Sequence, residues 1–146
     1  MKLLTALTAV SNLPPDVRVP VSDRAAQEPV MRIGMPAGQA WPLDDMLASL
    51  LMVSANDVAW AMAECSGGSV DGFAAQGNAL MRRLGATDGR FGDPAGLSDR
   101  SAYGGGSRLS PWDLAVLGRN ALAVPAIAGP AGTVELRFTD VAGRPH

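Results

Sequence analysis

A short polar segment, Ser54-Ala55-Asn56-Asp57, lies between two apolar runs and carries the side chains best suited to chemistry. A hydroxyl and an amide two residues apart at the mouth of a helix can face one cavity. There Ser54 could pass protons and Asn56 could hold a substrate peptide group. The alternative is helix capping, with Ser54 as the N-cap and Asp57 closing a capping box. Neither capping nor packing requires an amide at Asn56, so the segment favours a site.

A second candidate is the only lysine, Lys2, in a chain with eleven arginines. A desolvated lysine amine can lose its proton and act as a base, whereas an arginine guanidinium effectively cannot. The alternative is a compositional preference for arginine that has left a single lysine. Both interpretations stay open on composition alone.

The composition is that of one globular domain, with 146 residues, 47% of them hydrophobic and 18% charged. A net charge of -2 does not favour nucleic acid or an anionic membrane as a partner. The single cysteine, Cys65, excludes an internal disulfide, and the single histidine, His146, is the last residue. We therefore expect neither a Ser-His-Asp triad nor a His/Cys metal site, and no apolar run long enough to span a bilayer.

Helical periodicity and capping residues predict the elements that must position these side chains. Leu3, Leu7 and Val10 share one face of a first helix, although a signal peptide over the same residues is an alternative. Five helices are predicted: one over Met1–Val10, one beginning at Pro42, one from Asn56 to about Cys65, one that Ser69 caps and Gly85 ends, and one from Ser110 to about Leu122.

Strand signals are fewer. Val17–Val21 predicts a short edge strand, Arg32–Gln39 a loop with a second short strand, and Val134–Phe138 the clearest alternation of apolar and polar residues. The glycine-rich segment Ser98–Arg108 contains Gly104-Gly105-Gly106, but no strand precedes it and no lysine follows it. We therefore interpret it as a flexible connection and not as a phosphate-binding loop.

Several segments, taken in order, resemble one known family over nearly the whole chain. They are Lys2–Leu7, Gly38-Gln39, Leu43–Val53, Ser54–Ala59, Leu84–Thr87 with Phe91, Asp93–Leu97 and Asp113–Ala115. The family is the serine-type D-alanyl-D-alanine carboxypeptidases, the low-molecular-mass penicillin-binding proteins. The resemblance implies an α+β fold, namely the helical part of a β-lactamase/transpeptidase-like fold with an incomplete antiparallel sheet, as a single partial domain over residues 1–146.

The resemblance also implies acyl transfer through a covalent serine ester. Lys2, held neutral, would take the proton of the nucleophile, Ser54 would carry it to the leaving amine, and Asn56 would hold the amide of the substrate. The implied substrate is a peptidoglycan stem peptide ending in D-Ala-D-Ala, with β-lactams as acylating inhibitors. No metal or organic cofactor and no nucleic acid is implied, the location is the cell envelope, and the oligomeric state is not indicated.

Two parts of the family's pattern are missing. A serine three residues before Lys2 would precede Met1, and no Lys-Thr-Gly occurs. We therefore expect an internal fragment that is inactive by itself, with Val134–Phe138 short of strand partners and with weak folding or association. The alternatives are a serine β-lactamase, a non-catalytic cell-wall-binding relative, and a small exported helical binding protein with Met1–Val10 as its signal.

Overall fold

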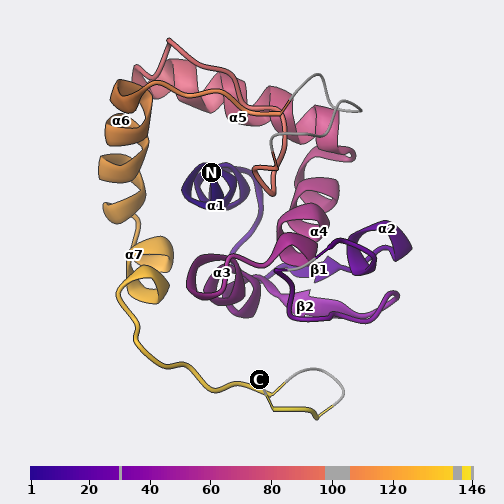
Figure 1. Ribbon diagram of the computed structural model, residues 1–146. Coiled ribbons are helices and arrows are strands. Elements are labelled where there is room, and N and C mark those ends of the chain that lie inside the picture. The colour runs from indigo at the N-terminus through magenta and orange to yellow at the C-terminus, as the bar shows by residue number, and fades with distance from the viewer. Residues whose placement is uncertain (30, 98–105, 140–142, 146) are drawn as a thin grey trace.

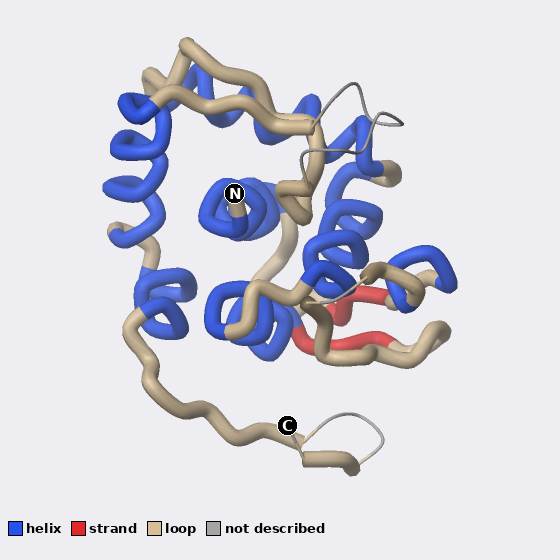
Figure 2. The backbone as a smooth tube through the Cα atoms, in the orientation of Figure 1, coloured by secondary structure: helices blue, strands red, loops and turns tan. Residues whose placement is uncertain are grey.

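The structure, a computed structural model, describes residues 1–29, 31–97, 106–139 and 143–145, and it is mostly helical (Figures 1 and 2). Helices surround a central helix, and a small two-stranded sheet lies at one side of them. The elements are α1 (Lys2–Asn12), β1 (Arg18–Pro20), α2 (Asp23–Ala26), β2 (Ala40–Pro42), α3 (Leu43–Met52), α4 (Asn56–Gly67), α5 (Val70–Leu84), α6 (Pro111–Leu122) and α7 (Pro125–Ala131).

Helix α1 is the centre of the core. Every residue from Leu4 to Ala9 is buried, and α3, α4, α5, α6 and α7 all pack against the helix (Figure 1). Burial on all sides is possible because small side chains such as Ala6 and Ala9 let neighbouring helices approach closely. The predicted helix is confirmed, and its central position argues against the signal-peptide alternative.

The predicted helix ends are also confirmed. The Ser69 hydroxyl accepts a hydrogen bond from the backbone N–H of Gly72, and Gly85 ends α5 in the left-handed conformation with φ of 86°. Ser110 and Asp113 form a capping box at the start of α6. Helix α7 was not predicted, and Pro125, three residues after the end of α6, is its first residue.

The sheet of the described residues consists of β1 and β2, which pair antiparallel with Val19 opposite Trp41. Both of these side chains are fully buried. The prediction of a strand near Val17–Val21 is confirmed, but the second strand lies at Ala40–Pro42 and not within Arg32–Gln39. The incomplete antiparallel sheet of an α+β fold is therefore present.

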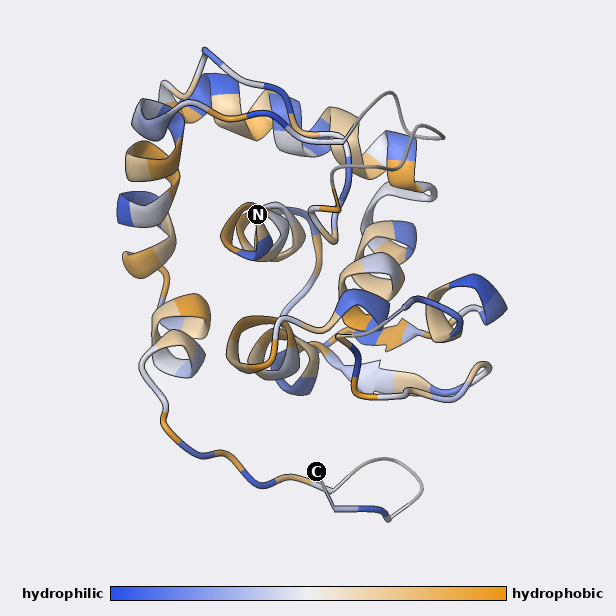
Figure 3. Cartoon of the chain, in the orientation of Figure 1, coloured by the Kyte–Doolittle hydropathy of each residue, from blue (hydrophilic) through white to orange (hydrophobic). Residues whose placement is uncertain are grey.

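The prediction of a strand over Val134–Phe138 is wrong. This segment is extended and alternates in hydropathy, as Figure 3 shows, yet within the described residues it joins no sheet. Val134 is 100% exposed, and only Phe138 reaches the core, where its ring meets Trp41 edge-on at 6.1 Å between centroids. Alternation sets which side chains share a face, but a strand also requires a neighbouring strand.

Two further sequence features are placed as follows. Most of the glycine-rich segment Ser98–Arg108, including Gly104 and Gly105, lies outside the described residues. Among the described residues no single helix is long and apolar enough to cross a membrane, while α6 and α7, bent by 101° at their break, pass that test only as a pair and only on length and composition.

Two helix-interior glycines allow a matched test of the packing around α1. A Cβ atom at Gly77 would lie 2.4 Å from Cδ1 of Phe91 and 3.2 Å from Oγ1 of Thr8, whereas a Cβ at Gly118 would meet nothing within 4 Å. We expect Gly77→Ala to lower the free energy of unfolding by about 1 to 3 kcal/mol because of overpacking. Gly118→Ala should leave it unchanged or raise it by up to about 1 kcal/mol through helix propensity. Urea denaturation measures the free energy of unfolding of both variants. Equal changes would contradict the close packing of Gly77 against Phe91.

Candidate active site

The structure brings the three predicted site residues together from three places in the chain. Lys2 is the first residue of α1, Ser54 lies between α3 and α4, and Asn56 is the first residue of α4. The Lys2 Nζ lies 3.1 Å from Ser54 Oγ and 2.8 Å from Asn56 Oδ1, and it donates a hydrogen bond to each. Because α1 is fixed in the core, the lysine reaches its partners from a rigid helix and not from a loop.

A third partner was missed by the sequence analysis. The Lys2 Nζ also donates to the backbone carbonyl of Ala95, at 2.9 Å. An ammonium group has three hydrogens, and each of them therefore has an acceptor. A backbone carbonyl has no signature in residue type, so the sequence does not single out Ala95.

The surroundings of Lys2 make the neutral form of its amine easier to reach than in an exposed lysine. Burial lowers the pKa of Lys2 from its ordinary value, and the negative charge of Asp93 opposes this in part. A lysine with a lowered pKa can accept a proton at a pH where an exposed lysine stays charged. The cluster is thus suited to proton transfer between an amine and a hydroxyl.

Ser54 has an uncommon backbone conformation. Its φ is 58°, and among the residues that the structure describes it is the one non-glycine residue with a positive φ. The residue is not the N-cap of α4, because that position is Ala55, which makes no side-chain cap bond. The capping alternative is therefore wrong. Left-handed backbone costs about 1 to 3 kcal/mol for a residue with a Cβ and tends to occur at functional sites.

Asp57 fastens a loop to the site instead of closing a capping box. Its carboxylate is fully buried and accepts backbone hydrogen bonds from Ile33, Gly34 and Met35 at 3.3, 2.9 and 3.2 Å. It also accepts from the N–H of Val58 at 3.0 Å. The N–H groups of residues 33–35 therefore bond to a side chain and not to a strand, which fits their loop conformation.

Residues just before this loop hold Asn56, which is only 4% exposed. Its backbone N–H donates to the carbonyl of Met31 at 2.7 Å, and its Nδ2 donates to the carbonyl of Pro29 at 3.3 Å. A carbonyl can only accept, so the amide nitrogen faces Pro29 and Oδ1 faces Lys2. In the structure Asn56 therefore orients the Lys2 amine. The predicted contact of Asn56 with substrate stays a prediction.

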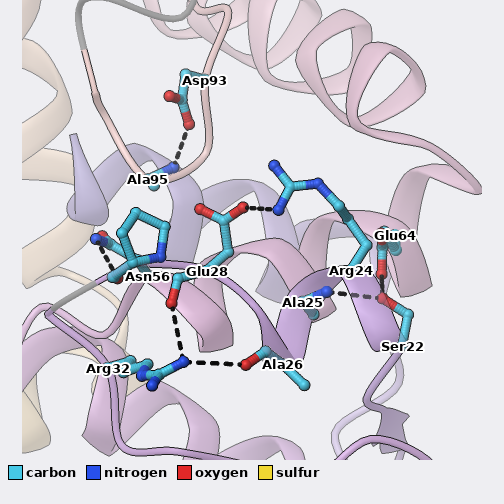
Figure 4. A network of polar contacts seen from close by, with 11 residues as sticks. Ser22, Arg24, Ala25, Ala26, Glu28, Arg32, Asn56, Glu64, Asp93 and Ala95 are labelled. Carbon is cyan, nitrogen blue, oxygen red and sulfur yellow. Dashed lines mark hydrogen bonds and ion pairs between the residues drawn. The ribbon is translucent and has the colours of Figure 1, made fainter.

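A network of polar contacts lies in the segment before this loop (Figure 4). The buried carboxylate of Glu28 pairs with Arg24, and Arg32 donates to the carbonyls of Ala26 and Glu28. These contacts tie Arg32, at the start of the loop, to the segment that follows α2. Among the described residues no group of three or more His, Cys, Asp or Glu side chains could hold a metal ion.

Comparison with known proteins assigns the family. The family model described as D-alanyl-D-alanine carboxypeptidase matches residues 1–138. The chain belongs to this family. The resemblance inferred from the sequence is thereby confirmed, and a carboxypeptidase is favoured over the β-lactamase alternative.

Sequence identity to individual members of the carboxypeptidase family supports the same assignment. The chain is 29% identical over 118 residues to D-alanyl-D-alanine carboxypeptidase DacF of Bacillus subtilis, covering 81% of this chain and 29% of DacF. It is 33% identical over 128 residues to DacB2 of Mycobacterium tuberculosis, covering 88% of this chain and 43% of DacB2.

The fold agrees as well. The crystal structure of D-alanyl-D-alanine carboxypeptidase from Mycobacterium tuberculosis superposes with a TM-score of 0.87 at 30% identity, covering 97% of this chain and 52% of that one. The predicted transpeptidase-like α+β fold is therefore confirmed. The chain spans about a third to a half of the length of these relatives.

The lowered pKa of Lys2 can be measured directly, because the chain has one lysine. Labelling with ¹³C-lysine gives a single Cε resonance, and we expect its titration midpoint in the folded chain to lie below that of the unfolded chain, since burial disfavours the ammonium. The unfolded chain in urea is the control and should titrate near 10.4. A folded-state midpoint at or above the unfolded one would contradict the burial of this amine.

The role of Asp57 predicts a large loss of stability on its removal. Asp57→Ala leaves the N–H of Gly34 and the buried N–H of Met35 without their acceptor, and we expect a loss of at least about 2 kcal/mol. The control Asp71→Asn changes an exposed carboxylate in the first turn of α5 and should cost less than about 1 kcal/mol. Urea denaturation measures the free energy of unfolding of both variants. Comparable losses would argue against a role of the Asp57 carboxylate in holding residues 33–35.

Proposed function

We propose that this chain supplies the base, the proton relay and the positioning amide of a serine-type D-Ala-D-Ala carboxypeptidase that works through an acyl-enzyme. The observation that carries the proposal is the contact of one partly desolvated amine, Lys2 Nζ, with both Ser54 Oγ and Asn56 Oδ1. An amine and a hydroxyl in hydrogen-bond contact can exchange a proton, which is what activation of a serine nucleophile requires.

The roles follow from the chemistry of each group. Neutral Lys2 takes the proton of a nucleophilic serine as that serine attacks the substrate carbonyl, and Ser54 returns the proton to the departing amine of D-alanine. Asn56 holds the Lys2 amine through Oδ1, and the second hydrogen of its Nδ2 can bind a carbonyl of the stem peptide. These 146 residues contain no serine three places before a lysine and no Lys-Thr-Gly, so residues 1–146 are proposed as a partial domain.

Substrate and location follow from the same proposal. The substrate class is a peptidoglycan stem peptide that ends in D-Ala-D-Ala, and β-lactams are the acylating inhibitors. Peptidoglycan lies outside the cytoplasmic membrane, so the place of action is the cell envelope.

A chimera tests the function. Residues of this chain replace the matching 128-residue region of DacB2, and the product is assayed for release of D-alanine and for covalent labelling by a fluorescent penicillin. We expect both activities in the chimera. A folded chimera, judged by a cooperative melt, that neither releases D-alanine nor takes up label would contradict the proposal and favour a non-catalytic wall-binding relative.

Variants of the chimera test the roles. We expect Lys2→Ala and Ser54→Ala each to lower the rate of penicillin acylation by at least about 100-fold, the usual contribution of a positioned proton-transfer group. Asp71→Asn, which alters an exposed carboxylate on α5, is the matched control and should retain the parent rate. Acylation that survives loss of the Lys2 amine would assign the base elsewhere.

The chain by itself should not be acylated. Because it has no serine at the nucleophile's place in the family pattern, incubation with fluorescent penicillin should give no covalent adduct by mass spectrometry. Stoichiometric labelling of the isolated chain would sink this expectation and reveal a different nucleophile.

A further inference from the structure

Helix α6 turns an apolar face to solvent. Trp112 is 66% exposed, Leu114 is 51% exposed and Leu122 is 63% exposed. Among the described exposed residues of α6, Arg119 is the one that carries a charge. Figure 3 shows apolar turns along this helix at the outer edge of the molecule. A surface helix normally directs its apolar residues toward the core, so an outward apolar face marks an interaction surface.

The apolar residues of α6 lie beside a cation. One stripe along the helix, with spacings of three, four and three residues, consists of Trp112, Ala115, Arg119 and Leu122. Trp112 and Arg119 line the same shallow hollow. The stripe therefore presents an aromatic ring, an aliphatic side chain and a guanidinium group on one side of the helix. In α7, which follows, none of the described exposed residues is charged.

The segments around the end of α5 add positive charge. Arg82 and Arg83 are exposed in the last turn of that helix. Arg90 and Arg108, both exposed, lie directly opposite each other in an antiparallel bridge, with backbone N···O distances of 2.6 and 2.8 Å. Opposite positions of an antiparallel pair bring side chains close together, so like charges there concentrate positive potential.

These arginines adjoin the start of α6. Arg108 lies two residues before the N-cap Ser110, whose hydroxyl donates to the Asp88 carboxylate at 3.0 Å. The N–H of Asp88 in turn donates to the carboxylate of Asp113, in the first turn of α6, at 3.2 Å. Figure 1 shows the end of α5 and the start of α6 meeting at one corner of the molecule. This α5–α6 corner carries both the arginines and the stripe.

The charge of the chain is unevenly distributed. Before residue 82 there are eight acidic and four basic residues, so the net negative charge arises there. In the described residues between 82 and 134, five arginines are exposed, whereas Asp88 is the one exposed acid and Asp93 and Asp113 are fully buried. The net charge of -2, which by itself does not favour an anionic membrane, therefore conceals a locally cationic surface.

We propose that the α5–α6 corner docks on an anionic lipid surface. The arginines attract the headgroups, while Trp112 and Leu122 enter the boundary between headgroups and acyl chains, where tryptophan is favoured. A second copy of the chain fits less well, because two such corners face to face would place arginine against arginine. The helix lies on the surface and does not cross it, since Leu117 and Ala121 on its other side are buried in the core.

Trp112 supplies the probe for the test. The chain has three tryptophans, and the other two, Trp41 and Trp60, are buried. A fluorescence change on addition of vesicles therefore reports on Trp112. With vesicles of phosphatidylglycerol and phosphatidylcholine at low ionic strength, we expect the emission to shift to shorter wavelength, and with phosphatidylcholine alone to change little. Trp112→Phe, which keeps an aromatic ring, should co-sediment with the anionic vesicles without the shift.

Four substitutions at exposed positions separate charge from apolar contact, and co-sedimentation measures the partition of each variant onto the anionic vesicles. Arg119→Gln should lower the partition by about fivefold, whereas the control Arg18→Gln, at an exposed arginine of β1, should change it little. Leu122→Ala should lower it roughly threefold to tenfold. Its control, Met31→Ala, removes an apolar side chain of similar exposure elsewhere and should have little effect.

Several results would overturn the proposal. A folded chain that does not bind anionic vesicles would do so, as would binding without a shift of the Trp112 emission. Losses of binding in the two control variants as large as those in the two stripe variants would also reject this surface. A concentration-dependent dimer that Trp112→Ala abolishes, without vesicle binding, would assign the face to a second copy.

Vesicle binding by the 146-residue chain does not involve acylation, so the docking surface and the proposed function can fail separately. Binding together with an inactive chimera would retain the surface and reject the carboxypeptidase. An active chimera together with a chain that does not bind vesicles would do the reverse.

Discussion

Everything in this structure depends on how one amine is held. Lys2 lies at the first turn of a helix that is buried on all sides, so it has little freedom to seek partners. The partners are instead brought to it, one from the α3–α4 connection, one from the start of α4 and one from a turn more than ninety residues along the chain. The helices around α1 are the scaffold that makes this meeting reproducible.

Two buried carboxylates do the positioning, and neither contacts the amine directly. Asp57 gathers the backbone N–H groups of residues 33–35 behind Asn56, and Asp93 gathers those of Ala95 and Leu97 beside the lysine. A carboxylate can be buried at acceptable cost when several N–H groups bond to it. The protein uses this to shape loops that have no regular structure of their own.

Much of the fold follows from local rules that can be applied to the sequence. Ser69, Gly85 and Ser110 mark helix ends by chemistry that operates within four residues, and they were predicted correctly. The failures are non-local. The Val134–Phe138 alternation is real, but no neighbouring strand meets it, and β2 begins only where its pairing with β1 allows.

In the candidate site, too, some groups can be identified from the sequence and others only from the fold. Lys2, Ser54 and Asn56 could be named because their residue types are unusual in their surroundings and because they match a family pattern. The Ala95 carbonyl could not, since every residue has one and only the fold says which of them points at an amine. The acceptor role of Asp57 was likewise invisible, because the N–H groups it binds lie more than twenty residues away.

The left-handed backbone at Ser54 has a consequence for how such a chain can change over time. Glycine adopts that conformation without strain, so a glycine at this position would make the fold easier to form while deleting the hydroxyl. Folding therefore favours a residue without a Cβ at position 54, whereas chemistry requires the serine hydroxyl that this Cβ carries. A lineage released from the need for catalysis would drift toward glycine here and gain stability from the loss.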